Sequence, residues 1–151
     1  MKTLTTILLL GALLLAGCES TAVSERFAAV PPQVHAFNGG LEAVHRAALR
    51  AFKRLDFTVT RSTMGRLEAA SAINTSETFG DSRQIVARVK ISEVAPGKSE
   101  VELTVSEEVS SPSMGGTRQR ALREHGFYQA YFAALQQVLH EMTTEEAVEK
   151  N

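Results

Sequence analysis

The sequence is poor in the residues from which enzyme and metal sites are usually built. Its 151 residues include one cysteine, two aspartates and four histidines. A single cysteine excludes an intramolecular disulfide, so the core must hold the fold together without one. The histidines are His35, His45, His125 and His140, and no two of them have HxxxH or HExxH spacing. The sequence therefore predicts no metal site.

The motifs of nucleophilic and phosphate chemistry are missing as well. There is no GxSxG sequence and no serine in a strand-to-helix elbow. The glycine pairs at 39–40 and 115–116 are too short to form a GxGxxG motif or a P-loop. Glu107 and Glu108 are adjacent, but neighbours on a strand point to opposite faces. We therefore expect no enzyme activity, no cofactor and no catalytic residue.

The sequence also has no large excess of positive or negative charge. Sixteen lysines and arginines face seventeen acidic residues, which gives a formal net charge of −1 at pH 7. This balance argues against bulk binding of nucleic acid. Beyond residue 18 the sequence has no apolar run long enough to cross a membrane, which takes about 20 residues.

The first 18 residues have the layout of a secretory signal peptide. Lys2 supplies a positive charge, an uncharged leucine-rich run follows from Ile7, and small residues precede the cysteine. The stretch "LAGC" resembles the lipobox of bacterial lipoproteins at all four positions, which are Leu15, Ala16, Gly17 and Cys18. The resemblance implies cleavage before Cys18, lipidation of its thiol, and acylation of the new amino terminus by a chain such as palmitate. The alternative is a plain signal peptide with a chance cysteine.

A lipidated Cys18 fixes the expected location of the protein. Two or more acyl chains anchor a protein stably, whereas one chain does so only marginally. In the lipoprotein pattern an aspartate after the cysteine retains the protein at the inner membrane, and here that residue is Glu19. We therefore expect a protein anchored to a bacterial membrane, facing the periplasm, with the outer membrane as its destination.

The rest of the chain divides into a tether, a domain and a tail. Residues 18–37 start polar and reach Pro31 and Pro32, a pair that favours a stiff, extended chain. Residues 38–142 contain the periodic apolar segments and are predicted to form one domain. Residues 143–151 are predicted to form a frayed tail.

The domain begins and ends with helical periodicity. Apolar residues recur at three- and four-residue spacing from Leu41 to Leu55, as on one face of a helix. The segment 120–142 carries a second and cleaner stripe, which includes Tyr128, Tyr131 and Phe132. These aromatic residues have two interpretations, as core packing or as the lining of a small-molecule cavity between helix and sheet.

Alternating segments lie between the two helices. They cover 57–61, 66–72, 83–94 and 99–109, and the last two flank a Pro96-Gly97 turn that predicts a hairpin. Across this hairpin, Arg88 and Lys90 are expected to pair with Glu100 or Glu102. Each element has one apolar face. We therefore predict an α+β, two-layer sandwich: a four-stranded antiparallel meander with two helices packed on one face, in the order α-β-β-β-β-α.

This order resembles a group of small bacterial envelope lipoproteins of unknown function with a helix–meander–helix domain. These are similar in fold to the helix-grip domains of the lipoprotein in the β-barrel assembly machinery. The resemblance spans residues 36–142 and rests on "VHRAALRAFKRLDFTVT", "GRLEAA" and "VARVKISEVAPGKSEVELTV". The chain departs from the family at Asp56, where a glycine is usual, and in the long link over 107–132. The family implies a structural or interaction role facing the periplasm and no activity to transfer.

Two basic groups are candidate contacts for an anionic surface. One is on the first helix, and the other precedes or opens the second; the residues are Arg46, Arg50, Lys53, Arg118, Arg120 and Arg123. They would contact anionic headgroups, lipopolysaccharide or an acidic partner, or else they form a solvated face balanced by nearby glutamates. The small-residue loop at 110–119 is either a partner-binding loop or slack chain.

The sequence thus predicts a lipid-anchored structural or protein-interaction module of the bacterial envelope. Its partners would be the membrane, through the anchor, and an envelope protein. The alternative is a small-molecule or lipid-binding carrier that uses a cleft between helix and sheet.

Overall fold

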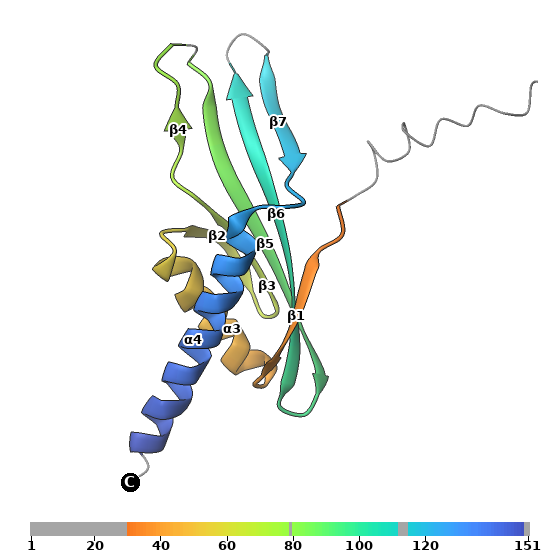
Figure 1. Cartoon of the computed structure of the whole chain (residues 1–151), viewed down its shortest axis with the longest axis vertical. Coiled ribbons are helices and arrows are strands. Elements are labelled where there is room, and N and C mark those ends of the chain that lie inside the picture. The colour runs from red at the N-terminus through yellow and green to blue at the C-terminus, as the bar shows by residue number, and fades with distance from the viewer. Residues whose placement is uncertain (1–29, 79, 112–114, 150–151) are drawn as a thin grey trace, which may run out of the picture.

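The computed structural model describes residues 30–78, 80–111 and 115–149. The predicted signal peptide (1–17), with lipobox residues Leu15, Ala16 and Gly17, and the lipidation site Cys18 lie outside these residues. In this part of the chain two helices pack against one seven-stranded antiparallel sheet, so the molecule is α+β (Figure 1). None of the described helices combines the length and apolar character needed to cross a membrane.

The sheet is built from strands of very different length. The strands are β1 (Gln33–Asn38), β2 (Thr58–Thr63), β3 (Arg66–Ala70), β4 (Asn74–Thr75), β5 (Ser82–Ala95), β6 (Lys98–Ser111) and β7 (Gly116–Ala121). Their main order is β1-β6-β5-β3-β2, with β4 added beside β5 and β7 added beside β6. The helices are α3 (Leu41–Arg54) and α4 (Gly126–Glu149).

The predicted four-stranded meander is wrong, because the described sheet has seven strands. β2, β3, β5 and β6 overlap the alternating segments, and β4 lies between two of them. β1 (33–38) begins inside the expected tether, and β7 (116–121) covers the end of the expected loop and the first two residues of the expected second helix. All six residues of β7 are exposed, so the strand has no buried face to mark it in the sequence. Three strands are thus added to the predicted four: β1 and β7 form their hydrogen bonds with β6, and β4 forms its own with β5. The second helix also continues past residue 142 to Glu149.

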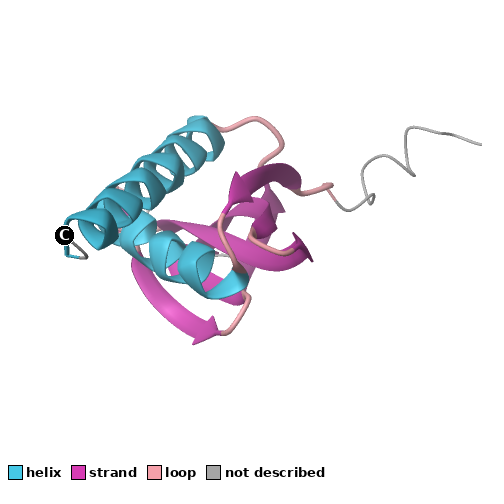
Figure 2. Ribbon diagram, turned by 90° about the horizontal axis from the view of Figure 1, so that it is seen from below, coloured by secondary structure: helices cyan, strands magenta, loops and turns pink. Residues whose placement is uncertain are grey.

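Both helices cover the same face of the sheet (Figure 2). Three alanines of α3, at 47, 48 and 51, are fully buried, and their small side chains let the helix lie close to the strands. The sheet contributes inward residues such as Val89, Leu103 and Val105, and α4 contributes Leu135 and Val138. One continuous core therefore lies between the helices and the sheet.

The sheet is longer than the helix layer. β4, β7 and the adjoining parts of β5 (82–86) and β6 (106–111) extend past the first turn of α4 (Figure 1). We call these four segments the β-arm. The part of the sheet under the helices holds the core, and the β-arm projects from it.

The edge of β6 changes partner where the β-arm begins. β1 pairs with β6 as far as Leu103, and β7 pairs with it from Ser106. Between them, the Val105 N–H donates to the Tyr128 hydroxyl (3.1 Å), which donates to the Leu122 carbonyl (2.9 Å). The Leu122 N–H donates to the Val105 carbonyl (2.9 Å). A side chain and a loop thus satisfy the backbone groups that neither strand reaches.

Candidate interaction surfaces

The space between helices and sheet is filled by aromatic side chains. The ring centroids of Phe52 and Tyr131 lie 4.6 Å apart, and those of Phe57 and Phe127 lie 4.3 Å apart. Tyr131 is fully buried, and burial raises the pKa of its hydroxyl well above the usual value. This hydroxyl has no hydrogen-bond partner among the described residues. The interface therefore serves as core, and a hollow of about 480 Å³ lies at its edge, where β1 meets α4.

The basic stripe of α3 faces carboxylates of α4. Because the helices are antiparallel neighbours, successive arginines of α3 meet successive glutamates of α4. The pairs are Arg46–Glu146 (3.8 Å), Arg50–Glu145 (3.6 Å) and Arg54–Glu141 (2.8 Å). The hydrogen bond from Arg54 lowers the pKa of Glu141, and the same bond raises the pKa of Arg54. Lys53 is exposed and has no ion pair within the described residues.

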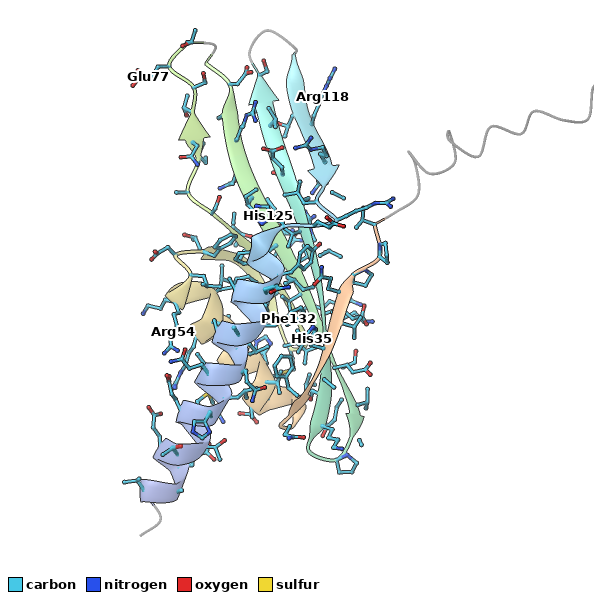
Figure 3. The ribbon with its side chains drawn as sticks, in the orientation of Figure 1. His35, Arg54, Glu77, Arg118, His125 and Phe132 are labelled. Atoms are coloured by element: carbon cyan, nitrogen blue, oxygen red, sulfur yellow. The ribbon has the colours of Figure 1, made fainter. Side chains whose placement is uncertain are left out.

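The second predicted basic group lies on a different part of the molecule. Arg118 and Arg120 are on β7, in the β-arm, and Arg123 follows the strand. Figure 3 shows Arg118 far from Arg54 and the α3 stripe. The six predicted residues therefore do not form one surface, and three of them, Arg46, Arg50 and Arg120, already have acidic partners.

A single carboxylate joins three of the four segments of the β-arm. Glu107 lies between Arg120 (2.9 Å) and Arg83 (3.7 Å), and only 16% of its side chain is exposed. The three residues come from β6, β7 and β5, so this cluster ties the arm together beyond the helix layer.

The outer edges of the β-arm are open. β7 pairs with β6 on one side, and no described strand pairs with its other side. β4 is two residues long and likewise has one partner, β5. An open edge presents unpaired N–H and C=O groups, which another extended chain can bind.

The face of the sheet opposite the helices carries a groove of about 500 Å³. We call it the outer groove. Pro32 is one of the residues that line the groove, and the other lining residues come from β2, β3, β5 and β6. Its charged residues are Arg61, Arg66, Glu68, Arg88, Lys90 and Glu102. Four cations and two carboxylates thus share one groove.

Two of these cations are paired. Lys90 donates to Glu102 (2.6 Å), which confirms one cross-strand prediction. Arg88 donates to Glu68 of β3 (2.7 Å), so its expected pairing across the β5–β6 hairpin is wrong. Within the described residues, Arg61 and Arg66 have no carboxylate within ion-pair distance. The sequence does not predict this groove. The alternating pattern of β5 indicates that Arg88 and Lys90 point outward, but it does not indicate that β3 and β6 are the neighbouring strands.

Two of the four histidines, His45 and His35, contact the boundary of the core, whereas His125 and His140 are exposed. His45 is 7% exposed, with Nε2 3.5 Å from the Ser62 hydroxyl. His35 stacks on Phe132, with ring centroids 4.1 Å apart (Figure 3). Among the described residues, no three histidine, cysteine or acidic side chains gather closely enough to hold a metal ion.

Comparison with known proteins gives little beyond this geometry. No protein-family model matches the chain, and no curated protein matches it. A similar solved structure is the adenylate sensor from AMP-activated protein kinase in complex with 5-aminoimidazole-4-carboxamide 1-beta-D-ribofuranotide, at 16% identity and a TM-score of 0.40. The match covers 70% of this chain and 94% of the other. A likeness this low carries no functional information.

Proposed function

We propose that this protein is a lipid-anchored periplasmic module of the bacterial envelope that binds a protein partner through its β-arm and catalyses no reaction. The anchor follows from the match of residues 15–18 to the lipobox and from the apolar run before it. Glu19 favours the outer membrane over the inner one. The binding role follows from the β-arm.

The observation that carries the proposal is the projection of the β-arm beyond the helices (Figure 1). A sheet that only had to hold a core would end where the helices end. Here β5 and β6 continue, and β7 joins them although none of its six residues is buried. Its open edge suits strand addition, in which main-chain hydrogen bonds supply affinity and alternate side chains supply specificity.

The alternative, a small-molecule carrier, has less support. It requires a cleft between helix and sheet, and aromatic rings fill that space. The outer groove lies instead on the outside of the sheet.

Site-specific photo-crosslinking in intact cells tests the binding surface. A photo-reactive amino acid is placed at Thr117, exposed on β7, or at Lys53, exposed on α3. We expect a discrete adduct with an envelope protein from position 117 and none from position 53, because only the first lies on the β-arm. Identical adducts from both positions, or an adduct from position 53 alone, would contradict the proposed surface.

A further inference from the structure

We propose that the outer groove binds a phosphate-bearing headgroup of the membrane in which the chain is anchored. This inference rests on the proposed lipid anchor, which brings the domain to a membrane. It gives the domain a second, headgroup-binding contact on the face opposite the helices.

The charge of the groove selects an anion. Its four cations exceed its two carboxylates, and both carboxylates are engaged, Glu68 by Arg88 and Glu102 by Lys90. Arg61 and Arg66 remain without a partner in the described residues. A guanidinium group binds phosphate oxygens through two parallel N–H donors, which is the contact this pair can offer.

The register of the sheet brings the cations together. Arg66 on β3 lies directly opposite Lys90 on β5, and Arg61 on β2 lies opposite Glu68. Like charges opposite each other on neighbouring strands repel. An anion between Arg66 and Lys90 would relieve that repulsion, so the groove favours a negative ligand over a positive or neutral one.

The groove lies near the predicted anchor in the sequence. Pro32 lines it, immediately before β1 begins. Cys18 is only fourteen residues before Pro32. A chain of that length spans at most about 50 Å, so the anchored domain stays within reach of the headgroups. A groove of about 500 Å³ also has the size of ordinary small-ligand sites.

Vesicle co-sedimentation tests the inference with the mature chain, residues 18–151, carrying Cys18→Ser, which lacks both the apolar signal peptide and the acylated thiol. The probes are vesicles of phosphatidylcholine alone and of phosphatidylcholine mixed with phosphatidylglycerol. We expect a preference for the anionic vesicles that falls about thirtyfold in the Arg61→Gln/Arg66→Gln variant. Two arginines at about 1 kcal/mol each correspond to that factor. Inorganic pyrophosphate is tested separately as a soluble phosphate ligand.

The matched control is Arg46→Gln/Arg50→Gln, which removes the same charge from the α3 stripe. This control is expected to keep the preference, because its arginines already face Glu146 and Glu145. An equal fall in both variants would mean that net charge alone drives binding and would overturn the site. Binding of pyrophosphate without vesicle binding would overturn the headgroup as the ligand.

A variant that unfolds must not be mistaken for one that loses headgroup binding. If the double glutamine variant melts early, Thr63→Glu replaces it, since it adds a negative charge to the groove from an exposed position. An unchanged vesicle preference in folded Thr63→Glu would overturn the inference. The chain in this assay carries no anchor, so a negative result does not bear on the lipid anchor, which cell fractionation tests.

Discussion

Two buried tyrosines, three positions apart on α4, differ in how their hydroxyls are satisfied. The Tyr128 hydroxyl accepts a hydrogen bond from Val105 and donates one to Leu122. The Tyr131 hydroxyl has no partner in the described residues, although its ring packs against Phe52 at 4.6 Å. Both rings serve the core, but only one hydroxyl contributes to it. Apolar periodicity predicts both rings as core and cannot distinguish the hydroxyls, because the distinction depends on a break in the edge of β6.

We expect replacement of tyrosine by phenylalanine to affect stability differently at positions 128 and 131. Tyr128→Phe should lower the free energy of unfolding by about 1–3 kcal/mol, because it leaves buried backbone groups of β6 and the following loop unpaired. Tyr131→Phe should leave stability unchanged or raise it, because it removes an unsatisfied buried hydroxyl. Chemical denaturation of the two variants measures the difference. Equal losses would show that the Tyr131 hydroxyl has a partner in solution.

The end of α3 shows how one element meets the next. The helix ends at Arg54, and Asp56 then has a φ of +58°, in the left-handed region that favours glycine. This is the position at which the sequence departs from the glycine usual in the resembling family. Aspartate tolerates this conformation better than most residues do, so the turn into β2 is kept.

Asp56→Gly is therefore expected to stabilise the domain. The gain should be below about 1 kcal/mol, because relief of the left-handed backbone is partly offset by the greater freedom of glycine in the unfolded chain. Thermal melting measures it. Asp56→Ala is the matched control and should lower the melting temperature, because alanine neither relieves the backbone nor offers a local hydrogen bond. A gain with alanine equal to that with glycine would point to the aspartate charge instead of the backbone.

Elements with their own apolar periodicity could be predicted from the sequence, and elements made by pairing could not. α3 and the β5–β6 hairpin each bury a regular face, so their patterns locate them. β1 and β7 follow from contact with β6, and β7 buries none of its side chains. The last turns of α4 were expected to fray. Instead Glu145 and Glu146 lie beside Arg50 and Arg46 of α3, a neighbour that the sequence does not reveal.

The two proposed surfaces of the whole molecule lie on different sides. The outer groove is on the sheet face opposite the helices, and the proposed partner site is the open edge of β7 in the β-arm. If the groove rests on headgroups, the helices point away from the membrane, and the open edge of β7 lies at the side of the sheet, where a partner can pair with it. Residue types alone could indicate that basic groups contact anions. Strand order decided which basic residues come together.

The lipid anchor predicts the behaviour of the whole protein in cells. Cys18→Ser should abolish membrane association, because the serine hydroxyl does not become the lipidated thiol. Fractionation of cells that express the variant measures this, and a membrane pool equal to that of the unmodified protein would refute the anchor. Glu19→Asp is the control: it should stay in the membrane fraction but shift toward the inner membrane.

β1 has a mechanical consequence as well as a structural one. It is both the first strand after the predicted tether and an edge strand, held to β6 by six residue pairs from Gln33–Leu103 to Asn38–Lys98. A force applied along the axis of β1 would act on all six pairs at once. A force applied perpendicular to that axis would break the hydrogen bonds of the pairs one after another. Under such load, the His35–Phe132 stack and the burial of Phe37 would be lost first. The β-arm, held to the rest of the sheet through β5 and β6, would keep its shape while the domain peeled from its anchor strand.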